Sequence, residues 1–187
     1  MHRADLLNRL RHYRTSFMEE AAMVDRTWQF VLQHENCFDR QLAHAHVTGS
    51  AWIINPSHTH ALMLHHKKLN RWLQPGGHAD GDPDILQVVL KETSEETGIA
   101  LENITLVSDN IFDVDIHTVH QSVHDNRHEH HDIRFLLMID DRLPIPGNSE
   151  SNQVAWVPLA HVSRYNNARS LYRLVNKTRA LQHSLAY

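Results

Sequence analysis

Residues 77–99, which read GHADGDPDILQVVLKETSEETGI, decide the fold of this chain. Asp82 and Pro83 form a helix start, because aspartate is a preferred N-cap and proline is favoured at the first helical position. Gly98 supplies the left-handed residue that often follows the last helical turn. The pattern predicts a helix over residues 83–97.

Three glutamates, Glu92, Glu95 and Glu96, project from one side of this predicted helix within a single turn. Like charges at this spacing destabilise a helix, and the macrodipole disfavours negative charge near a C-terminus. The other side is apolar, with Ile85 and Val89 among its residues, so we expect it to be buried and to fix the direction of the glutamates. Carboxylate oxygens on one rigid helix suit Mg²⁺ or Mn²⁺, although a solvated acidic face also explains the pattern.

The segment resembles the Nudix box, G-x5-E-x7-R-E-U-x-E-E-x-G-U, in which U is a bulky apolar residue. The matching positions are Gly77, Glu92, Glu95, Glu96, Gly98 and Ile99. Three positions depart from the box: Pro83 stands in place of a glutamate, Lys91 in place of an arginine and Thr93 in place of an apolar residue. The resemblance extends over about residues 47–162.

The resemblance implies an α/β protein with the Nudix α/β/α sandwich, in which a mixed β-sheet lies between helices. It also implies a hydrolase that uses Mg²⁺ or Mn²⁺ to cleave the diphosphate linkage of a nucleoside diphosphate linked to another moiety, such as ADP-ribose or a nucleotide sugar. The alternative is a Nudix-like domain that binds a nucleotide or metabolite without turnover, because Pro83 and Lys91 depart from the box. Isopentenyl-diphosphate isomerase shares the fold but needs a cysteine in its cleft, whereas Cys37 lies in the N-terminal extension.

The box glutamates and one glycine are the metal ligands that the resemblance implies. Glu92 and Glu96 are expected to be primary ligands, and Glu95 to bind the metal directly or through water. The carbonyl of Gly76 is implied as a further ligand.

The resemblance also implies roles for residues around this ligand set. Lys91 is expected to orient Glu92, although a single ammonium replaces the two-pronged donor of arginine. The catalytic base is implied to be Glu96 or Glu150. Glu150 precedes Trp156 by six residues, a spacing at which some family members carry an extra carboxylate.

Four further residues are candidate substrate contacts. Trp72 could stack on a base or sugar, or be a half-buried core residue, and His78 could reach a phosphate oxygen or face water. His130 and Arg134 alternate along a predicted strand with Ile133, so they share the face opposite to it. Both are candidate phosphate contacts if Ile133 points to the core.

The chain has 18 histidines, concentrated in Ser57–His66, in His117–His131 and in the pair His44/His46. Two or three imidazoles on one face of the strand near His128–His131 could hold Zn²⁺ or Ni²⁺. A polar strand edge explains the same residues, and the sequence leaves this choice open. Metal storage, pH sensing and solvated loops are the corresponding interpretations of the histidine content as a whole.

The first forty residues are expected to form a helical extension packed on a domain of residues 41–187. Apolar stripes predict helices over residues 5–14 and 19–35, with a capping box of Ser16 and Glu19 at the second. Further predicted elements are strands over 47–54, 60–64, 104–107, 111–116, 133–139 and 154–157, a histidine-rich loop over 118–131, and a helix over 171–185.

Composition excludes several classes of partner. The net charge of −4 with neutral histidines gives no basic surface for a nucleic-acid backbone. No apolar run reaches the length of a membrane span, and the N-terminus lacks the apolar stretch of a signal peptide. A lone cysteine, Cys37, fits a reducing compartment, so we expect a cytoplasmic protein without nucleic-acid or membrane partners. A second copy of the chain is a candidate partner.

Overall fold

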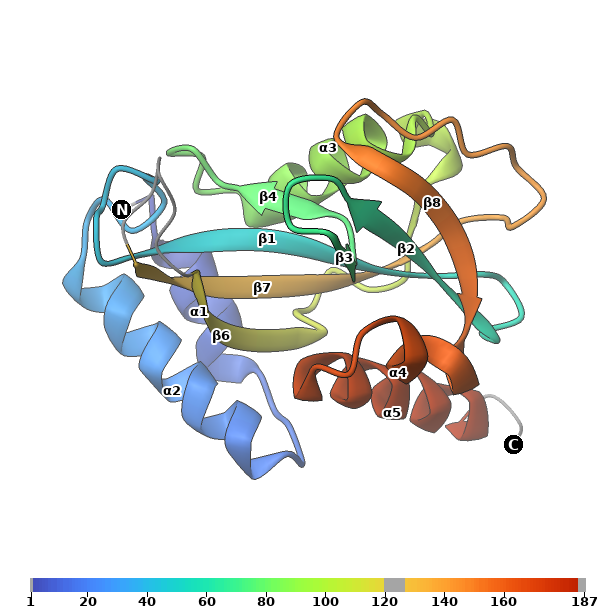
Figure 1. The fold of residues 1–187 in the computed structure, drawn as a ribbon. Helices are drawn as coiled ribbons and strands as arrows, with labels where there is room; N and C mark the ends of the chain where they lie inside the picture. The colour runs from blue at the N-terminus through green and yellow to red at the C-terminus, as the bar shows by residue number, and fades with distance from the viewer. Residues whose placement is uncertain (1, 120–126, 185–187) are drawn as a thin grey trace. The chain divides into compact units, whose positions relative to one another are not determined.

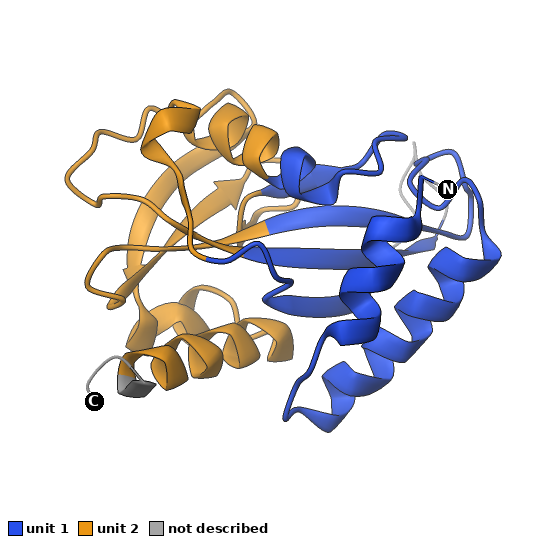
Figure 2. Cartoon of the chain, turned by 180° about the vertical axis from the view of Figure 1, so that it is seen from behind, with its two compact units in different colours: residues 1–50, 76–89, 108–135 blue, residues 51–75, 90–107, 136–187 orange. Residues whose placement is uncertain are grey.

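The structure is a computed structural model that describes residues 2–119 and 127–184 of the 187-residue chain (Figure 1). Two compact units make up the chain (Figure 2). Unit 1 comprises residues 1–50, 76–89 and 108–135, and unit 2 comprises residues 51–75, 90–107 and 136–187. Within the described ranges, no helix combines the length and the apolar character that crossing a membrane requires.

Unit 1 contains the two N-terminal helices and the strand segments on which they pack. Its elements are α1 (Ala4–His12), α2 (Met18–Gln33), the first half of β1 (Ala45–Ile54), β4 (Gly76–His78), the start of α3 (Ile85–Thr97), β6 (Asp113–Val119) and most of β7 (His128–Met138). Strand β4 is antiparallel to β1, and β6 is antiparallel to β7. Helix α2 packs against β6.

Unit 2 contains the ends of these shared elements and the C-terminal helices. Its elements are β2 (His60–His66), β3 (Arg71–Leu73), β5 (Thr105–Leu106), β8 (Ser151–Pro158), α4 (Val162–Tyr165), α5 (Arg169–Ser184) and short 3₁₀ turns at Leu101–Asn103 and Leu159–His161. Strand β2 is antiparallel to β1, β3 and β8, and β5 is antiparallel to β7.

Strands β1 and β7 are parallel neighbours in both units. In unit 1 the Glu129 N–H donates to the His44 carbonyl, and in unit 2 the Ile139 N–H donates to the Ile54 carbonyl. Residue numbers rise together on the two strands from the first bond to the second, as a parallel ladder requires. Together with the antiparallel ladders they confirm the mixed sheet, and every residue of β1 is buried.

Each unit buries apolar side chains from its own elements. In unit 2 Trp52 is fully buried and its indole N–H donates to Thr178 Oγ1 at 2.8 Å. In unit 1 Leu10 and Val31, on α1 and α2, are buried to 2% exposure or less. The apolar stripes that predicted the N-terminal helices are therefore buried or half-buried, except for Leu32, which is 47% exposed.

The predicted start of the box helix and its N-cap were wrong. Helix α3 begins at Ile85, and its N-cap is Asp84, whose Oδ1 accepts a hydrogen bond from the Gln87 N–H at 3.1 Å. The predicted cap, Asp82, instead accepts from the Asp84 N–H, because two aspartates flank Pro83 and either can cap locally. Gly98, with φ +72°, ends the helix as predicted.

Two further local predictions were wrong. The predicted capping box is absent from α2, which begins after Phe17 without a side-chain cap; the Phe17 N–H donates to Thr15 Oγ1 instead. The predicted loop over 118–131 is partly strand, because β6 continues to Val119 and β7 starts at His128. Residues 120–126 of that prediction lie outside the described residues.

Candidate active site

The three glutamates of the box segment lie on one side of α3. Glu96 is 8% exposed, Glu92 is half-buried and Glu95 is exposed. Thr93 and Thr97 are fully buried and are linked by a hydrogen bond from Thr97 Oγ1 to the Thr93 carbonyl at 2.6 Å. Because these threonines are buried, the helix is fixed in rotation and the carboxylates have a set direction.

A loop packs against the C-terminal end of α3. The Gly147 N–H donates to the Thr97 carbonyl at 2.9 Å, and a Cβ on Gly98 would lie 3.1 Å from Pro146. Glu150, the other candidate base, is exposed three residues after Gly147. Its backbone is held, because its N–H donates to Asn148 Oδ1 and its carbonyl accepts from the Lys67 N–H.

Lys91 forms its ion pair with Glu95, where the sequence predicted an interaction with Glu92. Lys91 Nζ lies 3.9 Å from Glu95 Oε1, and the two side chains are 70% and 57% exposed. An exposed pair at this spacing contributes only a few tenths of a kcal/mol. Lys91 can therefore be replaced with little cost to the fold.

In unit 1, β4 brings Gly76 and His78 against β1. Gly76 lies opposite Ser50, and a Cβ on Gly76 would be 2.5 Å from Ser50 Oγ, so only glycine fits there. The loop after β4 is held on both sides: the Gly81 N–H donates to the Phe38 carbonyl at 2.9 Å, and Arg40 binds Asp80 through two nitrogens. These contacts hold His78 in position.

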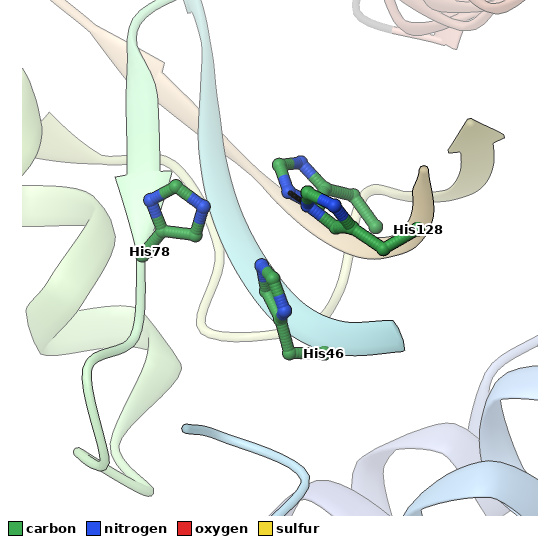
Figure 3. A group of neighbouring side chains, drawn as sticks. His46, His78 and His128 are labelled. Atoms are coloured by element: carbon green, nitrogen blue, oxygen red, sulfur yellow. Dashed lines mark hydrogen bonds between the residues drawn. The ribbon is translucent and has the colours of Figure 1, made fainter. Parts of the chain in front are cut away.

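Four histidines of unit 1 converge with their ring nitrogens. They are His46 on β1, His78 on β4, and His128 and His130 on β7. One nitrogen from each lies within 4.8 Å of those of the others, and Figure 3 shows His46, His78 and His128 gathered around a common space. Among the residues that the structure describes, this is the one group of three or more potential ligands with converging donor atoms.

A family model for the NUDIX domain matches residues 44–177. The chain belongs to the Nudix family. No curated protein sequence matches it significantly.

Solved structures agree with the Nudix fold. An Ap4A hydrolase binary complex from C. elegans has a TM-score of 0.58 at 18% identity, covering 74% of this chain and 98% of that one. An E. coli dihydroneopterin triphosphate pyrophosphohydrolase has a TM-score of 0.57 at 15% identity, covering 70% and 92%. The NUDIX domain of Shewanella oneidensis NrtR, complexed with ADP ribose, has a TM-score of 0.52 at 16% identity, covering 82% and 97%. At these identities the likeness establishes the fold.

Arg134 does not have the surroundings of a phosphate contact in this Nudix chain, which corrects the sequence-based prediction. Its side chain is 3% exposed, and its three nitrogens lie 2.7 Å, 3.3 Å and 3.1 Å from carboxylate oxygens of Asp132, Asp113 and Asp115. These aspartates raise the pKa of Arg134, although burial opposes them. Arg134 is therefore a buried counter-ion that joins β6 to β7.

Trp72 lies half-buried on β3, between two other rings. Its ring centroid is 5.4 Å from that of His65 and 5.1 Å from that of Tyr165, which is edge-on to it. The Asn166 side-chain amide donates to the Trp72 carbonyl. Trp72 thus packs in unit 2, and stacking on a substrate stays a prediction.

Cys37 is fully buried, and burial raises the pKa of its thiol to about 11. A buried thiol with a raised pKa is unreactive. This environment agrees with the exclusion of an isomerase that depends on a cysteine.

The structure joins His78 and His130, which the sequence singled out separately, and adds His46 and His128 to them. The shared face predicted for His130 and Arg134 on β7 also holds His128 and Asp132, since hydrogen bonds join His128 to His130 and Arg134 to Asp132. His46 was noted only as part of a histidine pair. Its position beside His78 depends on the pairing of β1 with β4, which no local pattern reveals.

Proposed function

We propose that this Nudix protein is a hydrolase that uses Mg²⁺, or Mn²⁺ in its place, to cleave the diphosphate linkage of a nucleoside diphosphate linked to another moiety. The observation that carries the proposal is the box helix α3, which holds Glu92, Glu95 and Glu96 on one side. Substrates of this class include ADP-ribose and nucleotide sugars.

The glutamates of α3 offer the type of donor atom that a hard divalent cation prefers, although among the described residues only the histidine group has donor atoms that already converge. The glutamate donors are carboxylate oxygens, which Mg²⁺ and Mn²⁺ prefer. Glu92 and Glu96 would be the primary ligands, and Glu95 would bind directly or through water. The bound ion would neutralise phosphate charge and lower the pKa of an attacking water.

The chain's own carboxylates would then accept the proton of that water. Glu96 and Glu150 are the two candidates for this base. Glu96 is largely buried on a helix, whereas Glu150 is exposed in the loop that packs on the end of the helix through Gly147. A pH–rate profile of Glu96→Gln beside one of Glu150→Gln separates them, because only loss of the base removes the acidic limb.

The second candidate function is nucleotide or metabolite binding without turnover. Lys91, which stands in place of the arginine of the box, favours it, because its exposed single ammonium pairs with Glu95 and cannot offer a carboxylate the two-pronged donor of arginine. The Shewanella oneidensis NUDIX domain complexed with ADP ribose has a similar fold.

A substrate panel tests the choice between the two functions. The full chain is incubated with ADP-ribose, nucleotide sugars, dinucleoside polyphosphates and oxidised nucleoside triphosphates, each with Mg²⁺ and with Mn²⁺. Mass spectrometry identifies the products, and calorimetry measures binding of the same compounds. The proposal predicts two phosphorylated products from at least one diphosphate-linked compound. Tight binding of a compound that stays intact would support the second function instead.

A further inference from the structure

We propose that His46, His78, His128 and His130 form a transition-metal site that takes Zn²⁺. The site shares no residue with the glutamates of the Nudix box, and the proposal does not rest on the proposed hydrolase activity. The ion would link three strands of unit 1.

Sheet register places the four side chains on one face. On β1, His46 lies two residues before Thr48, which is directly opposite His78 on β4. Residues two apart on a strand share a face, and so do residues directly opposite each other. His46 and His78 therefore project to the same side.

The same argument applies to β7. Asp132 accepts hydrogen bonds from Thr48 Oγ1 at 2.9 Å and from Ser50 Oγ at 2.8 Å, so it shares the face of Thr48. His130 and His128 precede Asp132 by two and four residues and lie on that face too. The opposite face of β1 is covered by α3, because a Cβ on Gly49 would lie 2.8 Å from Val89. Two independent ladders thus direct four imidazoles into one space.

The rings are already close to the geometry of a bound ion. The His46 ring centroid lies 5.0 Å, 4.8 Å and 4.7 Å from those of His78, His128 and His130. His128 Nε2 is 3.0 Å from His130 Nε2. Donor atoms around tetrahedral Zn²⁺ lie about 3.3 Å apart when Zn–N bonds are about 2.0 Å long. Four nitrogens within 4.8 Å of one another need to approach by at most about 1.5 Å to reach that spacing.

His46 supplies an observation that points to a ligand. It is 2% exposed, and neither ring nitrogen has a hydrogen-bond partner among the residues described. A buried polar group without a partner costs roughly 1–3 kcal/mol of stability. A metal ion bound to one nitrogen would relieve that cost, whereas a solvated strand edge would leave both nitrogens in water.

Burial and neighbouring rings change the pKa of two imidazoles in the cluster. Burial lowers the pKa of His46 to about 4 and that of His130 to about 2, and neighbouring imidazoles lower both further. The Leu42 backbone opposes the shift of His46 only weakly and does not reach hydrogen-bonding geometry.

The donor set selects the kind of ion. Imidazole nitrogen suits Zn²⁺, Ni²⁺ and Cu²⁺, and a site of four nitrogens has no oxygen ligand for Mg²⁺. A tenfold excess of Mg²⁺ should therefore leave bound Zn²⁺ in place. This selectivity separates the histidine cluster from the carboxylates of α3.

The test measures metal content and Co²⁺ spectra of the full chain. Protein loaded with Zn²⁺ is passed over a desalting column and assayed by elemental analysis, and the d–d absorption of Co²⁺ reports tetrahedral binding. His46→Gln/His130→Gln is compared with His34→Gln/His44→Gln. The His34→Gln/His44→Gln control removes another pair of neighbouring histidines of unit 1. Their ring centroids are 4.9 Å apart, but they lie outside the cluster.

We expect wild type and the control to retain one Zn²⁺ per chain. The cluster variant should bind Zn²⁺ at least about tenfold more weakly, because loss of a residue that only hydrogen-bonds to a metal ligand already lowers metal affinity by about that factor. Equal Zn²⁺ retention by wild type and the cluster variant would overturn the proposal. Loss of Zn²⁺ from the control as well would also overturn it, because binding would then belong to histidines at large.

A second variant keeps the test decisive if the double variant fails to fold. His46→Leu removes the two unpaired nitrogens, so in EDTA its melting temperature should equal or exceed that of wild type. With Zn²⁺ the order should reverse, because the ion stabilises only the protein that binds it. Equal Zn²⁺-induced shifts in both proteins would contradict the site.

Discussion

The two potential metal-binding regions of this Nudix chain, the glutamate side of α3 and the histidine cluster of unit 1, differ in origin. The glutamates lie within one helical turn, so a short sequence pattern suffices to bring them together. The histidines come from β1, β4 and β7, so only the register of the sheet assembles them. One region offers oxygen and the other nitrogen, so they should select different ions. The comparison teaches that local sequence reveals ligands on one helix more readily than ligands that come together from separate strands.

The largest expected effect comes from deleting residues 1–35, which contact β7, a strand that carries part of the histidine cluster. This removes α1 and α2, and with them Glu20, which is fully buried and accepts a hydrogen bond from the Val114 N–H at 3.1 Å. It also removes Phe30, whose ring stacks on His131 at 4.3 Å. We expect an insoluble or strongly destabilised protein, measured by expression yield and thermal melting. A soluble truncation that melts at the wild-type temperature would show that the extension is dispensable.

The next effect comes from Arg134→Met, which tests whether the buried ion pairs between β6 and β7 stabilise the fold. The change leaves Asp113, Asp115 and Asp132 buried without their shared cation. Removing one partner of a buried ion pair costs about 3–5 kcal/mol, which urea unfolding would measure. Arg142→Met is the control, because the Arg142–Asp140 pair is exposed and should contribute little. Equal stability of both variants would mean that the aspartates do not need Arg134.

The third effect tests the chemistry of the glutamate side. Glu92→Gln and, separately, Glu96→Gln should lower kcat by roughly a hundredfold or more on a substrate from the panel, because each removes an essential charged group. Glu102→Gln, an exposed glutamate in the turn after α3, should leave kcat unchanged. Near-wild-type kcat in both box variants would exclude them from the mechanism.

The smallest effect is a stabilisation by Thr93→Val. Thr93 is fully buried on α3, and its Oγ1 has no hydrogen-bond partner in the described part of the chain. Valine has nearly the same shape and removes the unsatisfied hydroxyl, so unfolding should cost about 1 kcal/mol more. Ser94→Ala should do the reverse, because Ser94 Oγ donates to the Ile99 carbonyl at 2.7 Å. A destabilised Thr93→Val would show that the hydroxyl has a partner in solution.

Much of the fold could be predicted from local patterns. The box helix, the glycine after it and the strands over 47–54 and 60–64 follow from local patterns, and the structure contains them. The N-cap could not be predicted, because Asp82 and Asp84 both flank Pro83 and only the folded backbone decides between them.

The role of individual polar residues was harder to predict, because it depends on neighbours distant in sequence. Arg134 resembled a phosphate contact until β6 placed Asp113 and Asp115 beside it. His128 lay in a stretch predicted as loop because of its polar composition, and it is instead the first residue of β7. Such residues acquire their roles from strand pairing, which the sequence does not display.

Melting of the full chain with Mg²⁺ tests most directly whether the glutamates of α3 form a metal site. Wild type and Glu92→Gln/Glu96→Gln are each melted in EDTA and in millimolar Mg²⁺ or Mn²⁺. Ion binding relieves repulsion that exists only in the folded state, so we predict a higher melting temperature for wild type with the metal and a much smaller shift for the variant. Identical melting temperatures of wild type in EDTA, Mg²⁺ and Mn²⁺ would contradict the account and leave the glutamates as a solvated acidic face.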